Sequence, residues 1–248
     1  MVRYDGWSGE SIALVEKACA RHGGWTLYER LSEVSAELVE LGGPLPAMKG
    51  LGRTFPAPAV VVVNPREQRT TFVDWPAPKS EGAFDRGDVR ITAGSGASLI
   101  SDAHRSRMPR SRWAPIDALY FFGYALSNYF ALPFLLASTR LVGHGRRSVV
   151  VEFPPGIDTH STRQVFHFDE SGLLVRHDYR ADVVSALATG SHYSSDYVSV
   201  DGLWFAKQRR VVGRLGAVAT PLPVLHAGLR RFGVRYDVRA QASAPADR

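Results

Sequence analysis

Cysteine is almost missing from this chain of 248 residues, in which Cys19 is the only one. A single thiol excludes an intrachain disulfide framework and a zinc site built from several cysteines. Ile12, Val15 and Cys19 recur at near-helical spacing before a Gly-Gly pair, which is typical of a short amphipathic helix and its end. We therefore expect Cys19 to be a small core residue.

The first residues have no apolar run. The opening MVRYDGWSGESI carries charges and a glycine where a signal peptide needs hydrophobic side chains. On this ground we expect a cytoplasmic location.

Charge is missing from residues 118–139, which contain no Asp, Glu, Lys or Arg. That length is sufficient to cross a bilayer. Gly123, Pro133 and several polar side chains make a poor lipid-facing span, however, and basic residues flank both ends. We expect a buried helix near 115–137 and no membrane contact.

The strong catalytic signatures are also missing. The sequence has no GxSxG elbow, no P-loop, no GxGxxG that opens a helix and no HExxH. These absences argue against serine hydrolases, nucleotide-dependent enzymes and zinc proteases. We expect no cofactor.

The overall composition is that of a globular protein, with 45% hydrophobic and 22% charged residues. The net charge of +6 and a pI near 9.7 would attract phosphate. The basic residues are scattered, however, and no aromatic-basic RNA motif accompanies them. We expect no nucleic-acid partner.

Strand patterns dominate the chain. Residues 31–41 alternate apolar and polar side chains, 59–75 form two β-branched runs around a turn, and short strands follow one another from 148 onward. Residues 42–58 are rich in glycine and proline, so we expect a loop that could serve as a lid. The fold class predicted is mainly β (α+β), a curved antiparallel sheet or half-barrel around a central apolar helix. We expect one domain over 1–239 and a disordered tail over 240–248.

The order of these elements resembles a known fold. An N-terminal helix that ends in GGW, a run of strands, an aromatic helix, then FPPGIDTHSTRQVFHFDESGLLVRHDY and DGLWFAKQRRVV make up the pattern. It is similar to the lipoprotein-localisation (LolA-like) fold and, more closely, to a group of uncharacterised actinobacterial proteins. The resemblance implies a half-closed sheet with an apolar cavity suited to an acyl chain or a flat metabolite, and it implies no reaction.

Titratable residues are dense on three neighbouring strands, and alternation sorts them by face. If the hairpin loop is 169–172, Gln164 lies opposite His177, and the cavity wall comprises His160, Gln164, His177 and Tyr179. A type I turn with a glycine bulge fits the same loop and would place Arg176 and Asp178 beside Gln164. The first register avoids burying arginines and aspartates against phenylalanines.

From this arrangement we predict a candidate site. The catalytic candidates are His177 as base, Tyr179 as acid, His160 and Gln164 as orienting groups, and Asp178 if the second register holds. The ligand-binding candidates are Tyr120, Tyr124, Tyr129, Phe166, His192 and Tyr193. Three histidines, His160, His177 and His192, could meet at a metal, but their spacing does not require it and we expect none.

These residues favour a cofactor-independent enzyme that acts on an apolar, polyketide- or terpenoid-like small molecule by acid/base cyclisation or isomerisation. The alternative is a non-catalytic carrier of a hydrophobic ligand or lipid. A weaker third possibility is a protein of membrane surfaces that uses its basic groups. The sequence does not indicate an oligomeric state.

Overall fold

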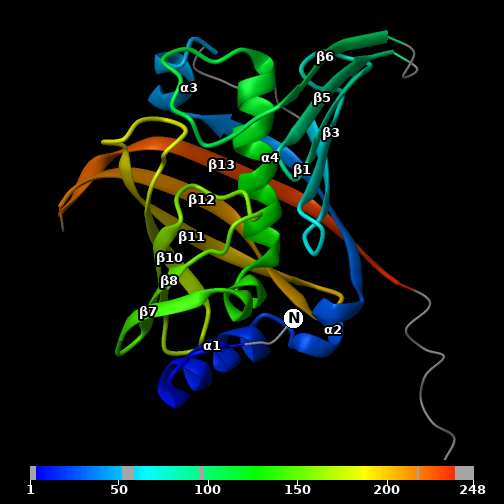
Figure 1. The fold of residues 1–248 in the computed structure, drawn as a ribbon. Helices are drawn as coiled ribbons and strands as arrows, with labels where there is room; N and C mark the ends of the chain where they lie inside the picture. The colour runs from blue at the N-terminus through cyan, green and yellow to red at the C-terminus, as the bar shows by residue number, and fades with distance from the viewer. Residues whose placement is uncertain (1–3, 52–58, 95–97, 217, 238–248) are drawn as a thin grey trace, which may run out of the picture.

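The structure of the chain is a computed structural model that describes residues 4–51, 59–94, 98–216 and 218–237. Its strands form one antiparallel sheet of thirteen members (Figure 1). The strands are β1 Leu31–Gly42, β2 Ala59–Asn64, β3 Arg69–Val73, β4 Ser80–Asp85, β5 Asp88–Ala93, β6 Ser98–His104, β7 Arg140–Gly145, β8 Ser148–Glu152, β9 Arg163–Phe168, β10 Leu174–Arg180, β11 Thr189–Val200, β12 Leu203–Leu215 and β13 Val218–Tyr236.

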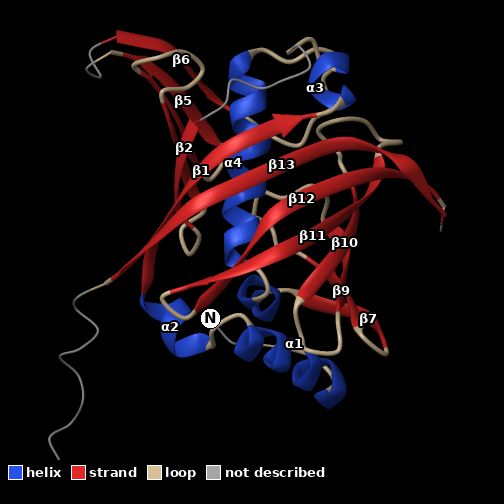
Figure 2. Ribbon diagram, turned by 180° about the vertical axis from the view of Figure 1, so that it is seen from behind, coloured by secondary structure: helices blue, strands red, loops and turns tan. Residues whose placement is uncertain are grey.

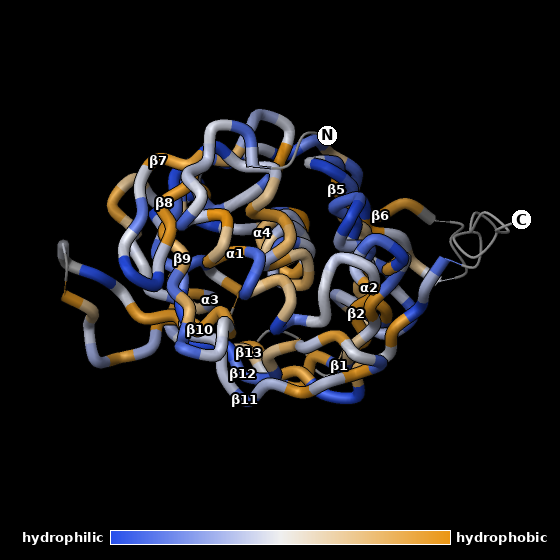
Figure 3. The backbone as a smooth tube through the Cα atoms, turned by 90° about the horizontal axis from the view of Figure 1, so that it is seen from below, coloured by the Kyte–Doolittle hydropathy of each residue, from blue (hydrophilic) through white to orange (hydrophobic). Residues whose placement is uncertain are grey.

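Neighbours in the sheet are neighbours in the chain except at the centre, where β1 pairs with β13. The edge strands are therefore β6 and β7. Register shifts interrupt the pairing of β1 with β13 at three places, and such bulges bend and twist a sheet. The sheet consequently curls, and Figures 2 and 3 show it wrapped around a helix.

That helix is α4, Pro115–Ala131, and it connects the two edge strands. Asp117 in its first turn is its only charged residue, which agrees with the position of the helix inside the curled sheet. Of its seventeen residues, fifteen are buried. None of the helices in the described part of the chain is long and apolar enough to span a membrane.

The shorter helices cover the ends of the curled sheet. At one end lie α1, Gly9–Arg21, and α2, Trp25–Arg30, and at the other lies α3, Pro44–Met48 (Figure 1). As expected, Cys19 is fully buried in α1, together with Val15.

The predicted fold class is confirmed, as are the central helix and the strands at 31–41 and 59–73. The central helix ends at Ala131 and continues as the short 3-10 helix η1, Phe134–Ser138, because Pro133 cannot extend the α-helical hydrogen bonds.

Other details of the prediction need correction. The sequences of β4 and β7 contain too many glycine and polar residues to be recognised as strands. The segment 42–58 was expected to be a loop, but Pro44–Met48 forms α3, with a proline in its first turn. Residues 52–58 and the predicted tail 240–248 lie outside the described residues.

The central helix packs unevenly against the two halves of the sheet. On the side of β2–β5 the fit is close, since a Cβ added to Gly123 would lie 2.5 Å from Cβ of Phe84. Thr70 on β3 also donates a hydrogen bond to the Gly123 carbonyl, at 2.9 Å. The cavity and the groove that α4 lines are instead found between the helix and the half formed by β1 and β10–β13.

Candidate functional site

Three histidines meet beneath α4. His160 lies in the loop before β9, His177 on β10 and His192 on β11, and each is at most 2% exposed. The rings of His177 and His192 are 4.6 Å apart between centroids, and those of His160 and His177 are 6.1 Å apart. His160 and His177, which were predicted to line one cavity wall, lie close together, although His160 precedes the strand on which it was expected and neither ring lines the cavity or the groove described below.

Tyrosines link the histidines through hydrogen bonds. The Tyr124 hydroxyl lies 3.0 Å from Nδ1 of His160, and the Tyr129 hydroxyl lies 2.9 Å from Nε2 of the same ring. Tyr129 also lies 3.0 Å from Nδ1 of His192. Tyr179 stacks on His160 with a centroid separation of 4.0 Å. We call His160, His177, His192, Tyr124, Tyr129 and Tyr179 the inner cluster.

Burial keeps the inner cluster uncharged at neutral pH. Loss of solvation lowers the pKa of His160 to about 3. For His177 and His192 burial is again the largest cause, nearby cations add to it, and the pKa falls well below the ordinary histidine value. Burial likewise raises the pKa of Tyr124 and Tyr179 well above 10.0. Neutral imidazoles each offer one donor and one acceptor.

At His177 the strand pairing follows neither of the two registers predicted from the sequence. The amide of Asp169 donates to the Leu173 carbonyl at 2.9 Å, and Gly172 has φ +98°, as in the turn with a glycine bulge. A second irregularity between Leu174 and Arg176 then shifts the pairing. His177 therefore lies opposite Phe166, and not opposite Gln164 as expected, yet it faces inward.

Two of the predicted catalytic residues have other partners. The Gln164 amide donates to the Thr159 hydroxyl and to the Ser161 carbonyl, so it holds the loop that carries His160. Asp178 lies on the outer face of β10, where it accepts hydrogen bonds from His167, Arg176 and Ser191. Neither side chain lines the cavity or the groove described below, although Asp178 lines a separate hollow of about 460 Å³.

The charge of Asp178 is strongly stabilised. Burial by itself would raise the pKa of this carboxyl, but the hydrogen bonds from its three partners outweigh burial and hold the pKa far below 3.8. Arg214 adds an ion pair at 3.0 Å. We call Asp178, His167, Arg176, Ser191 and Arg214 the outer cluster.

The predicted ligand-binding residues divide in the same way. Phe166 stacks on His177 at 5.4 Å inside the sheet. Tyr120 donates to a carboxylate oxygen of Asp158 at 2.7 Å, away from the histidines. Tyr193 follows His192 on β11 and points to the outer face of the sheet. The centroid of its ring lies 5.7 Å from the guanidinium carbon of Arg176 and 5.6 Å from that of Arg210.

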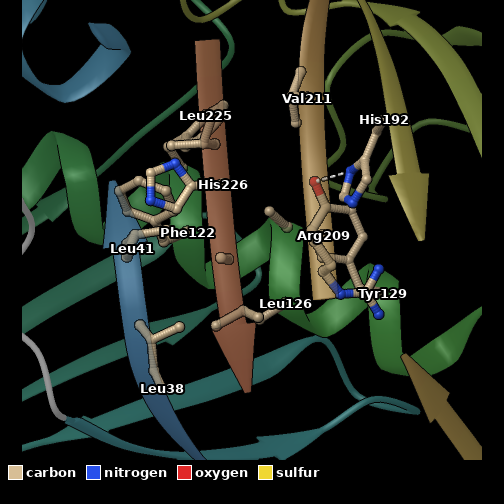
Figure 4. A pocket seen from close by; sticks show the side chains of 13 residues that line it. Leu38, Leu41, Phe122, Leu126, Tyr129, His192, Arg209, Val211, Leu225 and His226 are labelled. Carbon is tan, nitrogen blue, oxygen red and sulfur yellow. Dashed lines mark hydrogen bonds between the residues drawn. The ribbon is translucent and has the colours of Figure 1, made fainter. Parts of the chain in front are cut away.

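A small cavity adjoins the inner cluster (Figure 4). It has a volume of about 30 Å³, which is room for roughly two water molecules. Tyr129, His192 and Arg209 form its polar end, and apolar side chains form the rest: Leu38, Leu41, Phe121, Phe122, Ala125, Leu126, Val211, Leu225 and Ala227. His226 also lines it.

A larger apolar groove shares Phe121, Val211 and Leu225 with the cavity. Its volume is about 360 Å³, and Tyr179 lines it. At its rim, Met48 is 71% exposed and Leu187 is 89% exposed. Such exposed apolar side chains beside a hollow are typical of a binding surface.

Arg209 is the site residue that the sequence analysis missed. Its strand was recognised, but the residue was counted within a scattered basic group. Alternation along β12 offers a signal, because Phe205, Arg209 and Val211 share a face and the two apolar members point inward.

No group of three His, Cys, Asp or Glu side chains within the described ranges is placed to hold a metal ion. Although the three histidines do meet, both ring nitrogens of His160 have tyrosine partners.

Comparison with known proteins shows what the architecture is similar to. No family model matches the chain, and neither does any curated protein. Among solved structures, a LolA superfamily protein from Nitrosomonas europaea superposes with a TM-score of 0.52 at 8% identity, covering 95% of this chain and 94% of that one. The chain has a LolA-like fold. A DUF1329 family protein from Desulfovibrio piger matches with a TM-score of 0.48 at 14% identity, over 93% of this chain and 95% of the other.

At these identities the similarity establishes the fold alone. The LolA-like architecture predicted from the order of elements is confirmed, and the closer resemblance to an actinobacterial group stays a prediction. Function has to be argued from the cavity and the groove.

Proposed function

We propose that this protein binds a hydrophobic small molecule or lipid without converting it. The observation that supports the proposal is the apolar groove of about 360 Å³, which adjoins the cavity beneath α4. Ligand pockets of this kind are mostly apolar, with a few polar groups that orient the ligand. The acyl-chain cavity implied by the LolA-like resemblance agrees with it.

The chemistry of the inner cluster favours binding over acid/base catalysis. A general base needs a pKa near the working pH, whereas burial lowers the pKa of His160 and His177 well below neutral. Gln164, predicted to be an orienting group, donates its amide hydrogens to Thr159 and Ser161 in the loop that carries His160. We therefore favour a carrier over the cyclase or isomerase that the sequence first suggested.

A variant that fills the groove tests this proposal. Ala188 lines the groove and Ala186, two residues away, is exposed. We expect Ala188→Trp to weaken binding of the uncharged fluorescent probe N-phenylnaphthylamine by about tenfold, the effect of roughly 1.4 kcal/mol of lost contact. Ala186→Trp is the matched control and should bind like the parent chain.

Mass spectrometry of organic extracts completes the test. A hydrophobic ligand recovered chemically unchanged after long incubation with the full chain supports a carrier. A chemically converted product would support the cyclase or isomerase instead. The absence of any probe binding by the parent chain would contradict the proposal.

A further inference from the structure

Arg209 is buried without an acidic partner. The residue is only 7% exposed, and its guanidinium carbon lies 4.5 Å from the centroid of the Tyr129 ring. Nη1 donates to the Ser194 hydroxyl at 3.3 Å, whereas Nε has no hydrogen-bond partner among the described residues. Figure 4 shows Arg209 beside Tyr129 and His192 at the polar end of the cavity.

Two other arginines with side chains only 21% exposed each have a carboxylate partner. Arg105 pairs with Asp117, and Arg214 pairs with Asp178. The groups that favour the charged form of Arg209 are the phenols of Tyr197 and Tyr129. Burial raises the pKa of Tyr197 to about 12 and raises that of Tyr129 further, so both phenols are neutral. The charge of Arg209 is thus uncompensated within the described residues.

A buried charge without a counterion is unfavourable, because the surroundings replace little of its hydration. The histidines near Arg209 do not compensate it, since they are neutral and its field lowers the pKa of His177 and His192 further, after burial. An anionic ligand group would supply the missing charge.

The inner cluster supplies a second group at the same place. Nε2 of His192 is buried and has no hydrogen-bond partner among the described residues. The bonds Tyr124–His160–Tyr129–His192 form a chain in which each contact uses one proton, so the protons can point in either direction along it.

One direction leaves fewer groups unsatisfied. If Tyr124 donates to His160, His160 donates to Tyr129 and Tyr129 donates to His192, each of these protons has an acceptor. The remaining proton is then on Nε2 of His192, which becomes an N–H donor at the cavity. The reverse direction would leave the fully buried Tyr124 hydroxyl without an acceptor in the chain.

We propose that Arg209 and His192 bind the carboxylate of an amphipathic ligand, a long-chain monocarboxylic acid whose head group occupies the small cavity and whose apolar body occupies the adjoining groove. This inference deepens the proposed function and rests on it. One guanidinium matches the single charge of a carboxylate, and its planar fork suits the two oxygens. A phosphate monoester with nearly two charges would leave one of them unpaired.

The test compares ligands that differ only in the head group. Displacement of N-phenylnaphthylamine from the full chain is measured for palmitic acid, methyl palmitate and hexadecyl phosphate, each at submicellar concentration. We expect the acid to bind about tenfold or more tightly than the ester, as a charge-assisted hydrogen bond predicts. In Arg209→Met the preference for the acid over the ester should disappear.

Arg210→Met is the matched control, because Arg210 neighbours Arg209 on β12 and is exposed. It should keep the preference for the acid. The comparison of acid with ester on the parent chain needs no variant, so it decides the proposal even if Arg209→Met does not fold.

The outcomes separate the two proposals. Equal binding of acid and ester by the parent chain, or tighter binding of the phosphate, overturns the carboxylate site and leaves the hydrophobic carrier in place. Binding of neither the neutral probe nor any of the three ligands overturns both.

Discussion

His177 and Asp178 are adjacent on β10 and equally hidden from solvent, at 2% and 5% exposure, yet their clusters handle polarity in opposite ways. The inner cluster has hydrogen bonds between phenols and imidazoles that burial keeps neutral. The outer cluster keeps a full negative charge and surrounds it with two arginines, a histidine and a serine.

The difference follows from what covers each face. Inside the sheet, α4 and its aromatic residues exclude water. Desolvation therefore disfavours charged groups, and the histidines and tyrosines of the inner cluster stay neutral. Outside, the partners of Asp178 remain partly open to solvent, with side-chain exposures of 28% for Arg176 and 32% for His167. Arg209 departs from the inner pattern, which is why we assign it to a ligand.

The largest expected effect comes from removing the outer charge. Asp178→Asn leaves Arg176 and Arg214 without their carboxylate and should lower the free energy of unfolding by about 3 kcal/mol. Because the folded pKa of Asp178 is depressed, its contribution is present above about pH 4 and is lost as the pH falls toward the folded pKa.

Chemical denaturation at pH 7 measures this loss. The control is Asp182→Asn on the same side of the chain, whose ion-pair partner Arg180 is 53% exposed. This substitution should change the free energy of unfolding by less than about 0.5 kcal/mol. Equal effects of the two substitutions would show that the outer cluster does not contribute through burial.

A somewhat smaller effect is expected from the centre of the inner cluster. Tyr129→Phe removes the hydroxyl that contacts both His160 and His192, and two buried ring nitrogens lose their partner. We expect a loss of about 2 kcal/mol in the free energy of unfolding, measured in the same way. Tyr193→Phe on the outer face should cost under about 0.5 kcal/mol. If both losses were alike, the network would not be stabilising.

The smallest effect is a change of slope with pH. The folded pKa of His177 is lowered by burial, so protons bind the unfolded chain first and stability falls as the pH drops below about 6.5. Each such histidine contributes about 1.4 kcal/mol per pH unit between its two pKa values. His177→Phe should remove one of these contributions from the plot of unfolding free energy against pH.

Phe166→Leu serves as control, because Phe166 stacks on His177 but does not titrate. It should lower the free energy of unfolding without changing the slope between about pH 6 and pH 4. An unchanged slope in His177→Phe would mean that this ring is protonated in the folded protein.

Alternation along the strands predicted much of the candidate site. It placed His177 and Tyr179 on one face of β10 and Asp178 on the other, as the structure has them. It did not predict the strand pairing. The turn at Asp169 shifts the register and the irregularity after Leu174 shifts it again, so that His177 faces inward only because both are present. Turn chemistry predicted the pairing of Asp169 with Leu173, and the hydrophobic pattern predicted the inward direction of His177.

What the sequence by itself determined is part of the set of elements: the strands of alternating pattern, an aromatic helix with little charge and a single buried cysteine, because these depend on period and composition. Only the tertiary structure decided that His160 reaches the histidines from a loop, that Tyr129 joins two of them, and that Arg209 lies among them without a carboxylate. These contacts join residues 31 to 80 positions apart in the chain. They depend on how the sheet curls around α4, which no local pattern specifies.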